Sequence, residues 1–276
     1  MEQGHVISTI ENQIGIIEFG HPLSNSLPGN ILNKLALTIT ELSKNENCKV
    51  ILLKSAGDRA FCAGASFDEL VAIKDLEEGR IFFSGFAKVI NACRTSQKII
   101  VARIQGKAVG GGVGIAASAD YAFATKHSAV KLSELAIGIG PFVVGPAVQR
   151  KIGLSAMSEL AIDATQWRSA EWAQNKGLYS SVSESSEIMD EKINELIQKL
   201  ANSNPDAMRE LKEIFWAGTE DWDELLARRA EISGRLVLSE FTRIAIHAFK
   251  KKINSSHFFF IWFVHISINC IFAPLI

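Results

Sequence analysis

Five glycines lie within the nine residues from Gly106 to Gly114, after a branched apolar segment and before a stretch of small apolar residues. Glycine loses more conformational freedom on folding than any other residue, so packing alone is a weak explanation for three in a row at Gly110–Gly112. A strand that ends in such a turn and continues as a helix exposes N–H groups that suit an anion or a polarised carbonyl oxygen. We therefore expect a strand–turn–helix unit with a binding site at its turn.

A second segment of small residues, Ala60–Phe67, also lies between an apolar strand and a helix. Small residues let a backbone N–H approach a ligand closely, and the start of a helix adds positive potential. Taken alone, this segment is equally well explained as a tightly packed connecting loop.

As far as a strand at Tyr121–Thr125, the chain alternates short apolar strands with amphipathic helices, which is typical of a layered α/β domain with mainly parallel strands. From Leu154 onward helices dominate, and their apolar faces must pack on the core or on another subunit. We expect a hairpin of His5–Ile10 and Gly15–Phe19, and further strands at Lys49–Lys54, Ile99–Ile104 and Tyr121–Thr125. A loop is expected over Ser55–Gly64. Helices are expected to open at Pro28, near Phe67 and around Phe82–Cys93, and a last helix to run from about Asp221 to Lys252.

Composition narrows the class of protein. Hydrophobic residues make up 47% and charged residues 21% of the 276 residues, an ordinary globular balance, and the formal net charge is −1. No basic block is long enough to hold a polyanion, so nucleic acid is not an expected partner. The four cysteines are scattered, which predicts a reduced, cytoplasmic setting and no metal site.

The final segment, Phe258–Ile276, has no formally charged side chain and follows three lysines. It approaches the length of a membrane span, which needs about 20 apolar residues. Three interpretations stay open: a membrane-contacting tail, a packing or assembly segment, and a foreign tail produced by a frameshift or readthrough. We favour the last because the composition changes abruptly where the charged helix ends.

A dinucleotide site is the main rival interpretation of the glycine turn. The segment Gly112–Ala117 fits the loose G-x-G-x-x-A pattern, and Glu134 follows at about the spacing of a ribose ligand. However, the strand ends at Gly106, well before these glycines, and Glu134 lies beyond the next strand and not at its end. We therefore reject this interpretation.

Taken together and in order, these segments closely resemble the crotonase superfamily, also known as the enoyl-CoA hydratase/isomerase family, over about residues 5 to 250. A single one of these motifs would be weak, but the full series at family-like separations is specific. The resemblance rests on Ile16–Asn25 leading to Ser26–Leu27, Val50–Lys54, the AFCAGA segment Ala60–Ala65, the turn Gly106–Gly114, Ala119–Asp120 and Lys131–Glu134.

The resemblance implies a fold, an assembly and a substrate. The fold is an α/β spiral of strand–strand–helix turns (1–200), followed by a helical C-terminal region used for oligomerisation (201–257), with 258–276 left as an apolar tail of uncertain status. Such chains assemble as homotrimers or pairs of trimers. The substrate is an acyl-CoA thioester, so coenzyme A belongs to the substrate and no separate cofactor is expected.

The resemblance also assigns roles to individual residues. Ala65 and Gly111 would donate backbone N–H groups to the thioester oxygen, which becomes negative when the neighbouring carbon loses a proton. The adjoining Gly64 and Gly110 would contact the substrate, and the loop around Ala63 would lie against the adenine. One such donor is typically worth about 3–4 kcal/mol in the transition state.

Glu134 lies where the family places a catalytic glutamate. The segment around it, Leu132–Gly138, is mostly apolar, and an apolar environment raises the pKa of a carboxyl group toward a useful value. A glutamate between a strand and a turn is otherwise commonly a solvated or capping residue. Asp120 matches a family position that is considered structural.

The sequence departs from the family pattern at several positions. Typical hydratases use two glutamates, and the position that matches the second is Gly114. Asp68 or Glu69 could supply another acid, although acids at a helix start are more simply explained by the helix dipole. Ser66 replaces a common acidic residue.

Gly140–Pro146 replaces a glycine-rich stretch of the family, and it contains Phe142 and two valines. If these bulky side chains line the acyl pocket, they favour a short or branched acyl chain. The resemblance thus predicts an enoyl-CoA hydratase or isomerase with one acid/base. The alternative is a non-catalytic subunit of the same fold that binds acyl-CoA or RNA.

Overall fold

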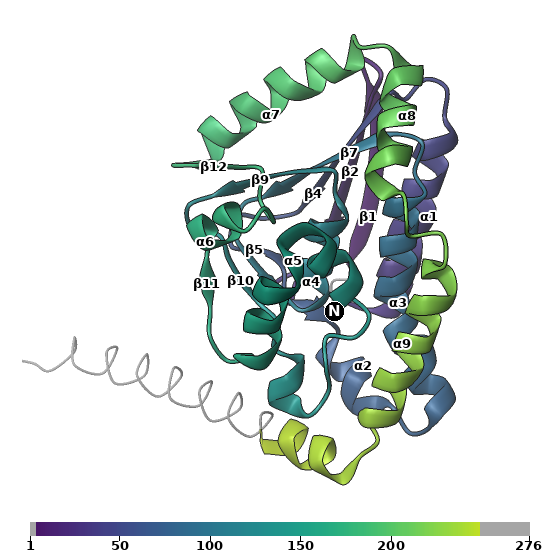
Figure 1. Cartoon of the computed structure of the whole chain (residues 1–276), viewed down its shortest axis with the longest axis vertical. Helices are drawn as coiled ribbons and strands as arrows, with labels where there is room; N and C mark the ends of the chain where they lie inside the picture. Colours follow the sequence, from purple (N-terminus) through teal and green to yellow (C-terminus); the bar gives the residue numbers. More distant parts are fainter. Residues whose placement is uncertain (1–3, 249–276) are drawn as a thin grey trace, which may run out of the picture.

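The computed structural model describes residues 4–248 and contains two main sheets with helices packed around them (Figure 1). The large sheet has six strands in the order β1-β2-β4-β7-β9-β12. All neighbours in it are parallel except β1 and β2, which form the expected hairpin. The bounds are His5–Glu11 for β1, Ile14–Gly20 for β2, Val50–Ser55 for β4, Ile99–Ile104 for β7, Tyr121–Thr125 for β9 and Ser181–Ser183 for β12.

A smaller sheet runs in the order β11-β10-β8-β5, and β3 pairs with β6 in a two-stranded sheet. Successive passes of the chain place one strand in the large sheet and the next in the small one: β4 then β5, β7 then β8, β9 then β10. This is the predicted spiral. The bounds are Ser26–Leu27 for β3, Ala60–Cys62 for β5, Gly64–Ala65 for β6, Lys107–Val109 for β8, Ala129–Lys131 for β10 and Arg168–Ser169 for β11.

The prediction of a loop over Ser55–Gly64 is wrong in part, because this segment contains β5 and the first residue of β6. These strands are only two or three residues long and consist mainly of small residues, so they carry no alternating hydrophobic pattern. They form because β8 and β3 offer partners on either side. Short strands of this kind depend on tertiary pairing more than on local preference.

Helices cover the sheets and fill the space between them. Pro28 is the residue before the first helix, where its missing N–H costs nothing. The bounds are Gly29–Lys44 for α1, Phe67–Ala72 for α2, Leu76–Arg94 for α3, Gly111–Ser118 for α4, Glu134–Ile137 for the 3₁₀ turn η1, Gly145–Ile162 for α5, Ala170–Asn175 for α6, Ser186–Ala201 for α7, Pro205–Trp216 for α8 and Trp222–Leu236 for α9.

The single long helix predicted from Asp221 to Lys252 is wrong. Helix α9 ends at Leu236, a turn follows, and a second helical segment covers 240–248. The hydroxyl of Ser239 accepts a hydrogen bond from the N–H of Thr242 at 3.3 Å, as a capping residue does at the start of a new helix. The expected end at Lys252 and the tail Phe258–Ile276 lie outside the described residues.

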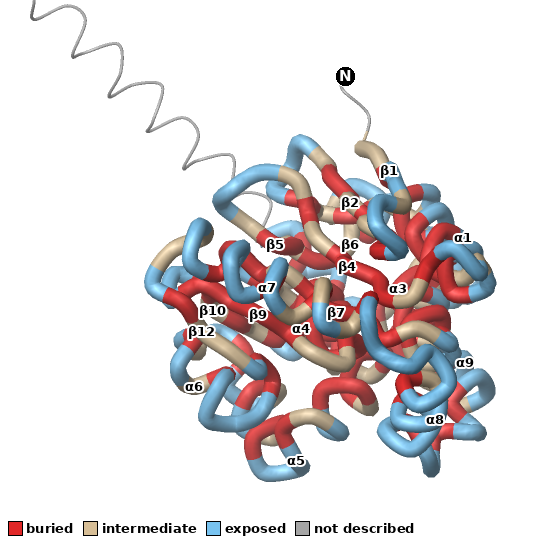
Figure 2. Tube along the Cα trace, turned by 90° about the horizontal axis from the view of Figure 1, so that it is seen from above, coloured by how far each residue is buried: buried red, intermediate tan, exposed pale blue. Residues whose placement is uncertain are grey.

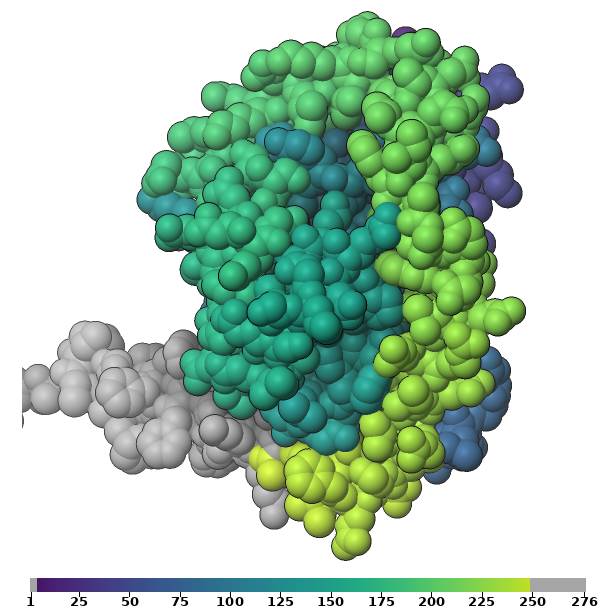
Figure 3. Space-filling view, viewed as in Figure 1, coloured from purple at the N-terminus to yellow at the C-terminus, as the bar shows by residue number. Residues whose placement is uncertain are grey.

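The main core lies between the sheets and around α4, whose residues are all buried (Figure 2). A second core cluster lies between the other face of the large sheet and α7. Helices α8 and α9 cover one side of the molecule (Figure 3). Helix α9 crosses α3 closely, since a Cβ built on Gly79 would stand 2.8 Å from the Cα of Gly234.

The carboxylate of Asp120 links helix α8 to the core through hydrogen bonds. Its carboxylate accepts hydrogen bonds from the N–H of Ile100 at 2.7 Å, the ammonium of Lys212 at 2.6 Å and the indole N–H of Trp216 at 2.9 Å. Lys212 and Asp120 form a buried ion pair whose charges are compensated by this network. These contacts agree with the structural role expected for Asp120.

Within residues 4–248, no helix is both long and apolar enough to cross a membrane. Among the same residues, no group of three or more His, Cys, Asp or Glu side chains could hold a metal ion.

Candidate active site

A cavity of about 840 Å³ opens where the two glycine-bearing segments meet η1. Its wall also includes residues of α2, α3, α9 and the helical segment 240–248. The structure brings all of the residues singled out for catalysis or substrate binding to this one wall: Ala63, Gly64, Ala65, Gly110, Gly111, Glu134 and Phe142.

The two glycine-bearing segments lie side by side. Strand β5 pairs with β8, with Cys62 opposite Ala108. A Cβ built on Gly64 would stand 3.9 Å from the amide nitrogen of Gly111 and 3.2 Å from the carbonyl oxygen of Val109. Gly64 also has a φ of +94°, which side-chain-bearing residues rarely adopt. Position 64 therefore requires glycine for both space and conformation.

The backbone of Ala65 is held by β3. The hydroxyl of Ser26 donates to the carbonyl oxygen of Ala65 at 2.8 Å, and the N–H of Ser66 donates to the carbonyl oxygen of Leu27 at 3.0 Å. These two hydrogen bonds hold the peptide unit between Ala65 and Ser66 against β3.

The glycine turn directs the start of α4 toward the cavity. The N–H of Gly110 donates to the carbonyl oxygen of Lys131 at 2.9 Å, and the N–H groups of Val113 and Gly114 donate to the carbonyl oxygen of Gly110. The N–H of Gly111 precedes these and has no acceptor within its own helix. The ring of Phe86 occupies the space where a Gly111 side chain would lie, so glycine is required here too.

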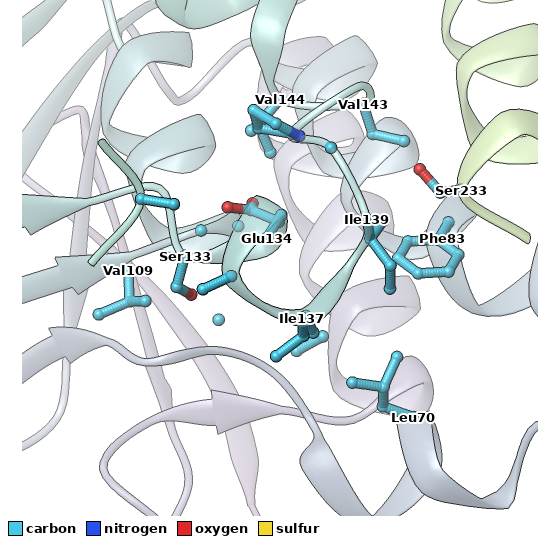
Figure 4. A pocket seen from close by; sticks show the side chains of 18 of the residues that line it. Leu70, Phe83, Val109, Ser133, Glu134, Ile137, Ile139, Val143, Val144 and Ser233 are labelled. Atoms are coloured by element: carbon cyan, nitrogen blue, oxygen red, sulfur yellow. The ribbon is translucent and has the colours of Figure 1, made fainter. Parts of the chain in front are cut away.

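Glu134 is the first residue of η1 and directs its carboxyl group into the cavity wall (Figure 4). The residue as a whole is half-buried, but its Oε2 is inaccessible and has no hydrogen-bond partner among the described residues. Burial raises the pKa of the Glu134 carboxyl to about 7, with a hydrogen bond from its own backbone acting weakly in the opposite direction. A buried carboxyl without a partner is unusual and marks a candidate acid/base.

One side of the cavity is apolar. Leu70, Phe83 and Ile139 lie together on one side of Glu134 in Figure 4. Phe142 lines the cavity and folds back over Gly140, whose Cβ would stand 2.5 Å from the Phe142 ring. Val143 and Val144 form another part of the cavity wall, so the bulky residues expected to line the pocket do line it.

Gly114 lies behind this wall and not on it. A Cβ built on Gly114 would stand 2.6 Å from Cγ1 of Val144, whereas Val144 itself lines the cavity. The valine therefore occupies the space into which a side chain at position 114 would extend.

Neither alternative acid reaches the cavity. Asp68 and Glu69 are absent from its described wall and lie in the first turn of α2, whose Ser66 cap accepts a hydrogen bond from the N–H of Glu69. The carboxylate of Glu69 accepts a hydrogen bond from the N–H of Gly29 at 2.9 Å. Both acids are helix-start residues, which was the simpler of the two interpretations.

Several wall residues were not anticipated. Lys131 lies on β10 opposite Val109 of β8, and the sequence does not reveal this register. Its position three residues before Glu134 could have indicated that it lies near the cavity. The helical segment 240–248 contributes Ala245 and Ala248. The other unanticipated wall residues with polar side chains are Ser133, Thr165 and Ser233.

Comparisons with known proteins identify related chains. The family model described as enoyl-CoA hydratase/isomerase matches residues 9–255. A short-chain-enoyl-CoA hydratase of Clostridium acetobutylicum is 28% identical over 255 residues, which are 91% of this chain and 97% of that protein. A carnitinyl-CoA dehydratase of Proteus mirabilis is 26% identical over 80% of this chain and 83% of its own length.

The fold is also found in solved structures. The crystal structure of an enoyl-CoA hydratase from Bacillus halodurans has a TM-score of 0.82 at 20% identity, and the match covers 88% of this chain and 99% of that one. At this identity the likeness shows the fold, which is the spiral of strand–strand–helix turns expected from the sequence.

Proposed function

Because this chain belongs to the enoyl-CoA hydratase/isomerase family, and is an enzyme of that class, we propose that it moves a double bond within an enoyl-CoA thioester. The observation that carries this proposal is the buried, unpartnered carboxyl of Glu134 in one cavity with both glycine-bearing segments. The names of the two curated relatives specify CoA substrates, which supports a CoA thioester here. Coenzyme A is part of that substrate, so no separate cofactor is proposed.

In the proposed reaction the Glu134 carboxylate removes a proton from C2 of a 3-enoyl thioester. The electron pair of the C2–H bond moves toward the carbonyl, and the thioester oxygen becomes negative. The backbone N–H groups of Ala65 and Gly111 stabilise that oxygen as the charge forms. The same carboxyl group then returns the proton at C4, which leaves a 2-enoyl thioester and the original carboxylate.

A pKa near 7 suits a group that must take up and release one proton in the same cycle. A carboxyl group with an ordinary pKa would be a weak base toward carbon. A carboxyl group with a much higher pKa would be protonated before the reaction begins. Burial of Glu134 supports the intermediate value that both half-reactions require.

The number of carboxyl groups separates isomerisation from hydration. Among the described residues that line the cavity, Glu134 is the one with a carboxyl group. Adding water across a double bond with two glutamates needs a second acid at position 114, where this chain has glycine backed by Val144. Hydration remains the second candidate because the Clostridium relative is a hydratase by name.

The acyl part of the substrate is proposed to be short or branched. Phe142, Val143 and Val144 narrow the cavity next to Glu134, and Phe83 and Ile139 make its far side apolar. A homotrimer or a pair of trimers is the proposed assembly, on the basis of the family alone.

Replacing Glu134 by Gln tests the proposal. Glutamine keeps the size of the side chain but accepts no proton, so we expect isomerisation of a 3-enoyl-CoA to fall by roughly 10²–10⁴. Binding of the thioester, measured by calorimetry, should change little. Crotonyl-CoA hydration is measured on the same variants, and wild-type hydration faster than isomerisation would favour the second candidate.

The matched control is Glu69→Gln, which makes the same chemical change outside the cavity and leaves an oxygen to accept from Gly29. It should retain full turnover. Undiminished turnover of every thioester by Glu134→Gln would remove that residue from its role.

A further inference from the structure

Asn25 is a buried polar residue directly before β3, and every hydrogen-bonding atom of its side chain is engaged. Its side-chain oxygen accepts a hydrogen bond from the N–H of His21 at 2.9 Å. Its side-chain NH₂ group donates to the carbonyl oxygens of Ala56 and Ala60, both at 2.9 Å. Because one partner is a donor and two are acceptors, only an amide in this orientation satisfies all three.

The same residue holds both ends of β5. This strand begins at Ala60, which is bound by the side chain of Asn25, and the N–H of Ala63 directly after the strand donates to the backbone carbonyl oxygen of Asn25 at 3.3 Å. The next two residues of the chain, Ser26–Leu27, then pair with Gly64–Ala65 of β6. Consecutive residues from position 25 onward therefore hold the segment that ends in Ala65.

Strand β5 also sets the position of the second glycine-bearing segment. It pairs with β8, with Ala60 opposite Lys107, and β8 leads directly into Gly110 and Gly111. The carbonyl group of Ala60 thus belongs to a strand that adjoins both segments. Its anchoring by Asn25 fixes the place where the two segments meet.

We propose that Asn25 is a positioning residue, which by anchoring β5 sets the separation between the N–H groups of Ala65 and Gly111. This proposal rests on the proposed function, in which these two groups stabilise the thioester oxygen. Asn25 is absent from the described wall of the cavity, so it acts through the backbone of other residues. Fixed donors stabilise a developing charge only in the correct place, and a shift of about 1 Å weakens them strongly.

Two variants separate the side-chain amide of Asn25 from its backbone. Asn25→Asp keeps the size of the side chain and an acceptor for His21, but its second oxygen cannot donate to Ala56 and Ala60. Asn25→Gly removes the side chain, and glycine adopts the φ of +56° at this position without strain. In both variants the side-chain amide of Gln105 still donates to the carbonyl oxygen of Ala60 at 3.2 Å, so β5 keeps one anchor.

Asn12→Gly is the matched control. It makes the same replacement at a φ of +52°, in the exposed turn between β1 and β2. Any effect of introducing glycine for asparagine in the left-handed region is therefore present in this variant, without the contacts to β5.

The kinetics of 3-enoyl-CoA isomerisation should show the defect in kcat and not in KM, because the negative charge on the thioester oxygen forms in the transition state. We expect kcat to fall about 10–100-fold in both Asn25 variants and KM to stay within about threefold of the wild type. Asn12→Gly should retain the wild-type values. An unchanged kcat in both Asn25 variants, or a rise in KM at constant kcat, overturns the proposal.

A bound thioester that does not react reports on the two donors directly. A saturated acyl-CoA labelled with ¹³C at its carbonyl carbon is followed by infrared difference spectroscopy, because hydrogen bonds to a carbonyl oxygen lower its stretching frequency. We expect a lowered frequency in the wild type and in Asn12→Gly, and a smaller lowering in both Asn25 variants. A general loss of stability would not change this frequency in the folded complex. The full wild-type shift in both Asn25 variants refutes the positioning role.

Hydrogen exchange in the ligand-free protein separates this proposal from the proposed function. We expect the N–H groups of Ala63 and Ser66 to exchange about tenfold faster or more in Asn25→Gly, since two hydrogen bonds that hold β5 are lost. Asn12→Gly should exchange as the wild type does. Faster exchange in a protein that isomerises no thioester would contradict the proposed function and leave Asn25 as the anchor of this segment. Unchanged exchange at both N–H groups refutes the anchoring by Asn25.

Discussion

A Cβ built on Gly110 would stand 3.0 Å from Oε1 of Glu134, so the carboxyl group of the proposed acid/base lies in the space that a side chain at position 110 would need. Gly110 has a φ of +52° and is the residue that leads into α4. Its N–H is bound to the carbonyl oxygen of Lys131, three residues before Glu134. The glycine turn therefore sets the position of the Glu134 carboxyl as well as that of the Gly111 amide.

The variant Gly110→Ala should impair turnover through Glu134. The added methyl group must displace the carboxyl or shift the turn, and a displacement of about 1 Å can cost on the order of 100-fold in rate. The positive φ adds about 1–2 kcal/mol of instability. Rates of 3-enoyl-CoA isomerisation and urea unfolding check both effects.

Gly57→Ala is the matched control for that variant. Gly57 has a φ of +79° and no atom within 4 Å of its built Cβ, so alanine there carries the backbone strain alone. It should lose similar stability and keep the wild-type rate. An equal loss of rate in both variants would show that strain, and not the contact with Glu134, is responsible.

The rate of isomerisation should depend on pH through Glu134. The proposed base must be ionised, and burial raises its pKa to about 7. We expect kcat/KM to increase about tenfold per pH unit below 7 and to level off above it. A profile from pH 5 to 9 measures this directly. A rate that is flat across that range would contradict the assignment of Glu134 as base.

The contribution of Glu134 to the stability of the folded protein should change with pH in the opposite direction to the rate of isomerisation. The pKa of Glu134 is higher in the folded protein than its usual value of 4.5, so the folded state binds more protons between these two values. The contribution of Glu134 to stability should be most favourable below pH 4.5 and should fall by on the order of 3 kcal/mol or less as the pH rises to 7. Glu134→Gln removes this loss, so in urea unfolding the variant should exceed the wild type at pH 8 and match it near pH 4.5. An advantage of the same size at both pH values would contradict this origin.

The two glycine-bearing segments and Glu134 could be selected from the sequence because each carries a local signal. Adjacent glycines after a strand indicate exposed N–H groups, and Glu134 stands out as a carboxyl in an apolar segment. The positions of both segments relative to Glu134 follow from the resemblance to a family with a spiral fold.

Other features of the site depend on the packing of distant segments. Val144 fills the space beside Gly114, and Phe86 does so beside Gly111, contacts that no spacing in the chain encodes. The break near Ser239 was missed because the residues on both sides continue a helical pattern. This break places Ala245 and Ala248 of the segment 240–248 at the cavity wall. The hydrophobic periodicity of the sequence does not predict that placement.

Lys212 should matter for stability and not for turnover. Replacing it by Met leaves the buried carboxylate of Asp120 without its ion-pair partner, which typically costs about 3–5 kcal/mol. Lys199→Met is the control, because Lys199 and Glu195 form an exposed pair on α7 that is worth less than about 1 kcal/mol. Urea unfolding compares the two variants. A loss of less than 1 kcal/mol in Lys212→Met would mean that Trp216 and Ile100 alone satisfy Asp120.

Position 114 and Val144 together should decide between isomerisation and hydration. Gly114→Glu alone introduces a carboxyl group into the space that Val144 occupies, since the built Cβ already stands 2.6 Å from the valine. Overpacking of this kind costs about 1–3 kcal/mol, and the carboxyl group is expected to gain no productive position. The single variant should therefore be less stable than the wild type and no better at hydrating crotonyl-CoA.

The double variant Gly114→Glu/Val144→Gly removes the obstacle as well as adding the acid. The new carboxyl group can then extend into the cavity that Val144 and Glu134 both line. We expect the ratio of hydration to isomerisation to rise at least tenfold over the wild type, a typical lower range for a newly placed acid or base. Val144→Gly alone controls for the added space, which lets water enter but supplies no acid. If that control raises the ratio as much as the double variant does, the valine limits hydration by excluding water, and the missing second carboxyl group is not the cause.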